Sequence, residues 1–87
     1  MTKEQIAVVR GVMIASKKCA NTYMKAIDTL KDEKRPVPSD WNAAWNLCFG
    51  AAMAYEGVLN LVGETQSGLW GIYGIDEELY QMLIERK

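Results

Sequence analysis

Residues 41–62 read WNAAWNLCFGAAMAYEGVLNLV, and this stretch carries a single charged residue, Glu56. Its apolar residues recur at steps of three and four, which is the spacing of one helix face. That face is made of Trp41, Trp45, Cys48, Ala52, Tyr55, Leu59 and Val62, and it is widened by Ala44, Leu47, Ala51, Ala54, Val58 and Leu61. A helix that is apolar around most of its circumference is usually buried on more than one side. One neighbouring helix is therefore not enough to cover it.

The chain just before this stretch holds its only two prolines, Pro36 and Pro38. Proline lacks a backbone donor and disfavours helix in the residue before it, so we expect a hinge here, with Ser39 or Asp40 as the N-cap of the next helix. Upstream of the hinge an apolar face again repeats at steps of three and four. It consists of Ile6, Val9, Met13, Ser16, Ala20, Tyr23, Ile27 and Leu30, widened by Val8, Val12, Ala15, Cys19 and Ala26.

These patterns predict an all-α fold in one domain, residues 1–87, built on an antiparallel helical hairpin of residues 3–34 and 40–63. Four glycines between residues 63 and 74 interrupt the periodicity, so a compact loop is expected there. Asp76 is suited to cap a short last helix, roughly 76–86, whose apolar stripe contains Leu79, Met82 and Leu83. Self-association would supply the remaining cover for the second helix, most simply in a two-fold dimer.

The charges are divided unequally along the chain, although the net charge is only −1. Residues 1–35 hold eight Lys/Arg and four Asp/Glu, whereas residues 36–87 hold two and seven. Such a division favours an acidic partner for the first part or the pairing of two copies. A general nucleic-acid binder is disfavoured by the sequence pI of about 5.3.

Catalytic residue combinations are few. The chain has no histidine, which removes the commonest general base and metal ligand. The carboxylates of Asp28 and Asp32, one turn apart, and of Asp76–Glu78 are explained by a solvated surface and by helix capping. Cys19 and Cys48 have no metal or redox spacing. On an assumed turn near residues 36–37 they are about 9 Å out of register, which favours two thiols, with a bridge between two chains left open. We therefore expect a protein that is not an enzyme, with no metal and no cofactor.

Two groups of residues are candidates for binding a partner. One is a basic strip on the back of the first helix, formed by Arg10, Lys17, Lys18 and Lys25, which could follow an acidic protein, a nucleic-acid backbone or an anionic lipid surface. The alternative for the strip, which we favour, is an ordinary solvated helix back. The other is the pair Trp70 and Tyr73 in the glycine-rich segment, since these residue types are common in interface hot spots. The alternative for the pair, which we favour, is that Leu69, Trp70, Ile72 and Tyr73 fold back over the second helix.

A candidate oligomer interface lies on what would be the solvent side of the second helix. Its small, amide and soft apolar residues suit close approach of another backbone: Asn42, Asn46, Phe49, Gly50, Met53, Gly57 and Asn60. The alternative is that residues 69–84 of the same chain pack there.

The predicted function is a non-catalytic, protein-binding helical module, such as a small inhibitor or adaptor of a larger machine; the parallel with small inhibitors encoded by phages is an analogy only. A homo-oligomer that binds or sequesters a small ligand or nucleotide is one alternative, and a structural oligomerisation protein is another. The start of the sequence has no signal-peptide pattern and the polar residues of the second helix disfavour a membrane span, so we expect a cytoplasmic location.

Overall fold

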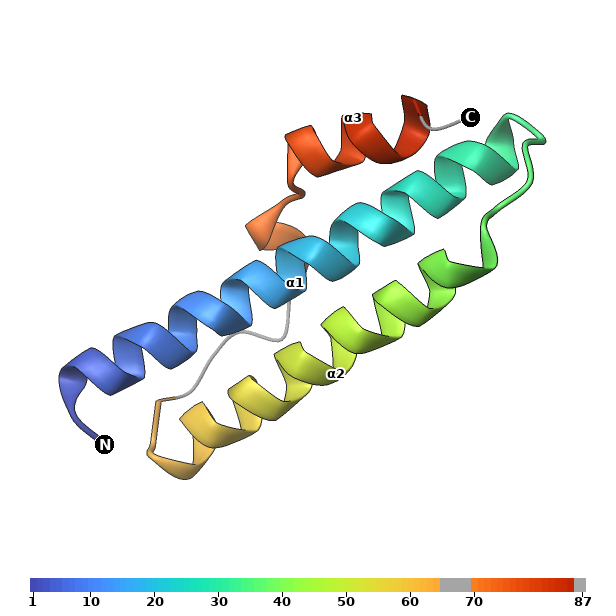
Figure 1. Cartoon of the computed structure of the whole chain (residues 1–87). Helices are drawn as coiled ribbons and strands as arrows, with labels where there is room; N and C mark the ends of the chain where they lie inside the picture. Colours follow the sequence, from blue (N-terminus) through green and yellow to red (C-terminus); the bar gives the residue numbers. More distant parts are fainter. Residues whose placement is uncertain (65–69, 86–87) are drawn as a thin grey trace.

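The structure is a computed structural model that describes residues 1–64 and 70–85. In these residues the chain forms the helices α1 (Lys3–Asp32), α2 (Ser39–Leu61) and α3 (Glu77–Glu85), with a short 3-10 turn, η1 (Trp70–Tyr73), before α3. Helices α1 and α2 lie antiparallel, side by side (Figure 1). The all-α prediction is confirmed, and each helix has bounds within one or two residues of those expected, although residue 86 lies outside the described part.

The helix ends follow from local hydrogen bonds. Thr2 caps α1 in a capping box, because its hydroxyl accepts from the Gln5 amide and the Gln5 side chain accepts from the Thr2 amide. The expected N-cap at Ser39 or Asp40 is wrong: Pro38 is the N-cap of α2, and no side chain there makes a capping bond. Proline already has a φ compatible with the entry to a helix, so Ser39 can take the first helical position. The expected cap of α3 is confirmed, since Asp76 accepts from the Leu79 amide.

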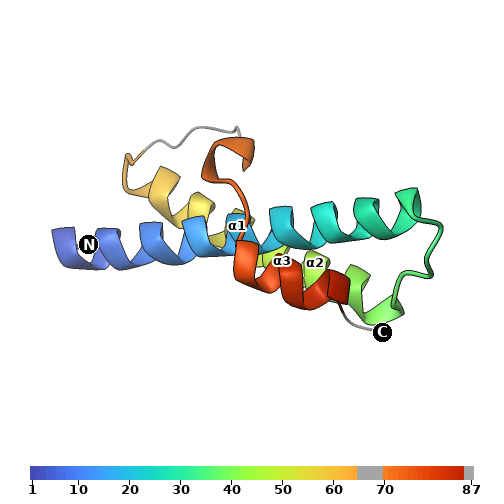
Figure 2. The same cartoon turned by 90° about the horizontal axis from the view of Figure 1, so that it is seen from above.

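Polar side chains of α1 hold the C-terminal part of the chain. Asn21 donates to the carbonyls of Trp70 and Gly74, at 2.8 and 3.1 Å. The buried hydroxyl of Thr22 accepts from the Asp76 amide at 2.9 Å. The chain crosses α1 between η1 and α3 at this point (Figure 2). As a result η1 and α3 pack against different sides of α1.

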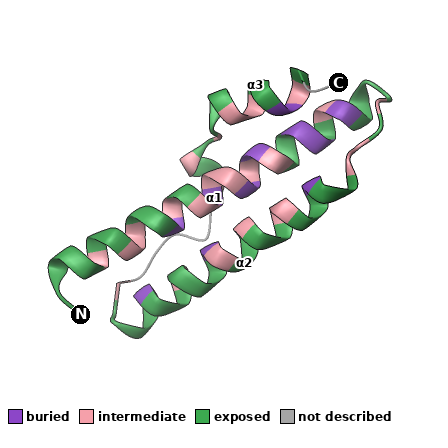
Figure 3. Cartoon of the chain, viewed as in Figure 1, coloured by how far each residue is buried: buried purple, intermediate pink, exposed green. Residues whose placement is uncertain are grey.

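The main core lies at the hinge end of the hairpin, where α3 covers α1. It consists of Ala26, Ile27, Leu30, Trp41 and Leu83. Buried residues gather in the C-terminal half of α1, whereas much of α2 is exposed (Figure 3). The molecule is elongated, with principal extents of 46 × 20 × 18 Å. None of the described helices has the length and apolar character needed to cross a membrane.

Candidate functional site

An apolar groove of about 650 Å³ runs along one flank of the hairpin, between α1 and α2. We call it the flank groove. Its walls carry no charged side chain: they are Ala7, Val8, Gly11, Val12, Ala15, Ser16 and Cys19 of α1 and Leu47, Cys48 and Ala51 of α2. The Val8 and Leu47 side chains are 65% and 75% exposed. Exposed aliphatic side chains that adjoin one another on two helices are a candidate binding surface.

The groove continues along α2 as a stripe of exposed apolar residues. Leu47, Val58 and Leu61 are spaced so that they lie on one side of the helix, and Leu61 is 87% exposed. The sequence pattern contains this surface, because all three residues belong to the arc that widens the apolar face of the second helix. Sequence reasoning does not identify this surface as a binding site, because residues that widen an apolar arc are usually core residues. Among residues 1–64 and 70–85, no further element covers them.

Lys17 is not on the solvated back of α1, and this corrects the predicted basic strip. Its side chain is fully buried, and Nζ lies 2.6 Å from Oε2 of Glu56 on α2. Neither atom has an aligned hydrogen-bond partner among the described residues, so the contact is an ion pair. The reason for the burial is helical spacing, since Met13, Lys17 and Ala20 follow at steps of four and three on one buried stripe. The sequence does contain an indication of this ion pair. Glu56 is the single charged residue of the apolar stretch 41–62, and a buried carboxylate requires a partner of opposite charge.

The other basic residues of the strip have separate environments. Arg10 pairs with Glu64 at 2.9 Å. The Lys25 ammonium lies 4.6 Å from the ring centroid of Tyr80 on α3. Lys18 is half-buried. The four residues therefore do not form one continuous exposed surface, and Lys18 with Lys25 are what remains of the predicted strip.

Trp70 and Tyr73 fold back onto the helices, which is the alternative that we favoured. The Trp70 ring stacks on Phe49 with a centroid distance of 5.0 Å, and Phe49 in turn lies 5.2 Å from Trp45. Both Trp70 and Tyr73 lie 5.3 Å from the Lys17 ammonium. Both are half-buried, whereas Ile72 is exposed. Leu69 lies outside the described residues. The two rings thus cover the buried ion pair, and the less favoured interpretation, an exposed aromatic loop, does not describe Trp70 and Tyr73.

The predicted oligomer face on α2 stays a prediction for most of its residues. Asn42, Asn46, Gly50, Gly57 and Asn60 are all exposed. Met53 is 49% exposed and Phe49 is partly covered by Trp70. The alternative was that the C-terminal segment packs on this face. Among the residues of the face with a described contact to that segment, only Phe49 is packed in this way.

The two cysteines are free thiols, but the inferred distance between them is wrong. Both line the flank groove, and burial together with a hydrogen bond to Cys48 raises the pKa of the Cys19 thiol from 9.0 to about 12. Because α1 ends at Asp32 and α2 begins at Ser39, the hairpin turns about one residue earlier than we assumed. The offset between the two cysteines is smaller as a result.

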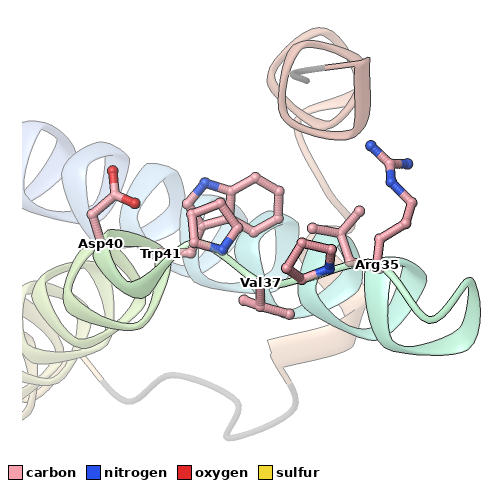
Figure 4. A pocket seen from close by; sticks show the side chains of 7 residues that line it. Arg35, Val37, Asp40 and Trp41 are labelled. Atoms are coloured by element: carbon pink, nitrogen blue, oxygen red, sulfur yellow. The ribbon is translucent and has the colours of Figure 1, made fainter.

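A second hollow, of about 510 Å³, lies at the hinge and is lined by Leu30, Arg35, Pro36, Val37, Pro38, Asp40 and Trp41. Arg35 and Asp40 stand at opposite ends of it, with Val37 and Trp41 between them (Figure 4). The Arg35 guanidinium already donates to the Ile84 carbonyl at 2.9 Å. The Trp41 indole nitrogen is fully enclosed and makes no hydrogen bond within the described residues. The polar groups of the hinge are therefore poorly placed to orient a ligand.

Metal chemistry has no site in the part of the chain that the structure describes, where no three Cys, Asp or Glu side chains could hold an ion together. In comparisons with family models, with curated proteins and with solved structures, nothing matches this chain. The geometry of the surface is thus the basis for assigning a function.

Proposed function

We propose that this chain is a non-catalytic helical module that binds another protein chain in the flank groove, in the role of a small inhibitor or adaptor. The observation that carries the proposal is the flank groove itself, which is apolar, without charged walls and open along its length. Two wall residues that are well exposed, Val8 at 65% and Leu47 at 75%, are aliphatic. Burying such side chains contributes roughly 25 cal/mol per Å² of apolar surface. A helix laid along the groove would remove this surface from water.

The proposal includes a cytoplasmic location and self-association. Free thiols at Cys19 and Cys48 accord with a reducing compartment. Two-fold self-association accords with the large exposed apolar surface of α2. The target of the module is a protein rather than a nucleic acid, because the groove lacks the cations that a phosphate backbone requires.

The test is affinity capture from a lysate of the host cell with matched variants. Leu47→Lys places a charge in the groove at a position that is already 75% exposed, so the fold should tolerate it. Ile72→Lys is the control, because Ile72 is 64% exposed and lies on η1, away from the groove. We expect the wild type and Ile72→Lys to retain the same target protein and Leu47→Lys to lose it. Retention by Leu47→Lys, or equal loss by both variants, would refute the role of the groove.

A further inference from the structure

One stripe of α1 is half covered by the protein itself. Val8, Val12, Ala15 and Cys19 line the flank groove, and Thr22, Ala26 and Leu30 continue the same stripe at steps of three and four. Thr22 bonds to Asp76, and Ala26 and Leu30 share a core with Leu83 of α3. Helix α3 therefore covers the C-terminal half of the stripe, and the groove is the half that α3 leaves open.

The open half has room for one more helical segment. Val8 and Cys19 are separated by about 16 Å along the axis at 1.5 Å per residue, and α3, with its 9 residues, spans about 13 Å on the same scale. Gly11 lies in this half, and a Cβ built on it would meet no atom within 4 Å. A second helix can therefore approach the backbone of α1 closely here.

The stripe is complementary to itself under a two-fold axis. If two α1 helices pack antiparallel across the groove with Val12 opposite the partner's Ala15, then Val8 lies opposite the partner's Cys19. In each pair a branched aliphatic side chain meets a small one, as interdigitated helix packing requires. Each contact occurs twice, which is the property of an isologous interface. No charge of the groove wall is buried in this arrangement.

The surface area of the single chain agrees with a missing cover. The accessible surface is 5721 Å², whereas a compact monomer of this mass exposes about 5,200 Å². The radius of gyration is 14.6 Å, against about 12 Å for a compact chain of this length. The single chain is therefore more extended and more exposed than a compact monomer of its length, which agrees with an apolar flank that the chain itself does not cover.

From these observations we infer that the flank groove is occupied by a second copy of this chain, in a two-fold dimer in which the α1 helices pack antiparallel through Val8, Val12, Ala15 and Cys19. This inference rests on the proposed function, because it names a second copy of this chain as the protein that occupies the groove when no target is bound. The dimer places four long helices in one bundle.

The first test is sedimentation equilibrium of the full chain between about 1 µM and 1 mM. We expect a dimer, and we expect Val8→Lys to weaken its association at least tenfold by placing two ammonium groups in an apolar interface. Met82→Lys is the matched control, because Met82 and Val8 are both 65% exposed, and it should associate like the wild type. A dimer that survives Val8→Lys, or a wild type that stays monomeric at 1 mM, would overturn the inference.

The second test fixes the register with a disulfide. In a Cys48→Ser background, Val8→Cys should give a covalent dimer through the partner's Cys19 when the protein is treated with dissolved oxygen and a copper catalyst, which accept the two electrons and two protons of each bridge. Within one chain these two positions are too far apart to be joined. Adding Cys19→Ser should abolish the bridge, and Met82→Cys should not replace Val8→Cys. Equal cross-linking by Met82→Cys would overturn the register.

The two tests also separate this inference from the proposed function. If the chain is monomeric but Leu47→Lys still loses a captured target, the groove binds a different protein, and only the identity of its occupant is refuted. If the chain is dimeric through the groove but no target is captured through it, the role as an inhibitor or adaptor is refuted and the dimer stands.

Discussion

Lys17 and Glu56 place two opposite charges at the point where α1, α2 and η1 meet. The ammonium is fully buried, and its neighbours are one carboxylate oxygen at 2.6 Å and the faces of Trp70 and Tyr73. Moving charges out of water costs more than a single ion pair returns, unless further hydrogen bonds help. The pair therefore contributes little net free energy to the stability of the fold. Its effect is on orientation, because it fixes which side of α1 faces α2 and η1.

Changing one partner of this pair should be much worse than changing both. We expect Glu56→Gln to lower the free energy of unfolding by about 3 kcal/mol, because it leaves a buried ammonium without its carboxylate. The double variant Lys17→Met with Glu56→Leu should unfold within about 1 kcal/mol of the wild type. Urea denaturation of Lys17→Met, of Glu56→Leu and of the double variant measures the coupling. Losses that simply add would contradict a coupled pair.

The Cys19 thiol of the folded protein should be alkylated slowly at neutral and mildly alkaline pH, so the copper-catalysed cross-link through it needs a long incubation. Burial first, and then Cys48, raises its pKa from 9.0 to about 12, so the thiolate that reacts with alkylating agents is scarce. In Cys48→Ser, iodoacetamide at pH 8.5 should modify Cys19 more than tenfold faster in urea than in the folded protein. Comparable rates in the two states would show that the thiol is exposed.

The same shift predicts how stability depends on pH. The native thiol has a pKa of about 12, whereas the unfolded thiol ionises near 9.0, so the stability that it contributes is complete below pH 9 and is lost as the pH rises through 12. The wild type should therefore lose unfolding free energy above pH 9 more steeply than Cys19→Ser. Parallel pH profiles for the two proteins would contradict this assignment.

At the scale of the elements, two adjacent residues of α1 decide where the C-terminal part of the chain lies. Asn21 holds the two ends of the segment from Trp70 to Gly74, and Thr22 holds Asp76 directly before α3. The side-chain amide of Asn21 supplies both donors, one to the carbonyl at the start of η1 and one to the carbonyl just after it. Without these bonds η1 would depend on aromatic contacts alone.

Asn21→Ala should therefore release η1 without unfolding the hairpin. We expect a loss of about 1–2 kcal/mol in stability, for two hydrogen bonds, and roughly tenfold faster amide hydrogen exchange in residues 70–76. Asn42→Ala is the control, since Asn42 is an exposed amide on α2, and its exchange should match the wild type. Unchanged exchange in Asn21→Ala would mean that stacking on Phe49 suffices to hold η1.

The helices themselves could be predicted because their periodicity is long and uninterrupted, and the prolines at 36 and 38 mark the hinge. Asn21 and Thr22 could not be recognised, because a polar residue on a helix back is usually solvated, and their partners lie about 50 positions further along the chain. Lys17 was misplaced for a related reason: a lysine is rarely buried unless it is paired, and the register that brings Glu56 to it is a tertiary property.

At the scale of the whole molecule, the hairpin has more apolar flank than its own C-terminal helix can cover. The sequence indicated the excess on the second helix, but it assigned the interface to the face of Asn46 and Gly50, because glycines and amides look like contact residues. The exposed aliphatic side chains, Val8 and Leu47 among them, lie along a different flank. The hydrogen bonds of Asn21 and Thr22 decide which flank α3 covers. Helical periodicity alone does not predict these bonds.

The most direct test of association through the flank groove is a dilution series in which methyl signals are followed by nuclear magnetic resonance. Val8, Val12 and Leu47 report on the flank groove, and Ile72 and Met82 are exposed apolar residues elsewhere. The account predicts that the groove methyl signals shift together between about 1 mM and 10 µM protein while those of Ile72 and Met82 stay constant. Constant groove signals over this range, or shifts centred on Ile72 and Met82, would contradict it.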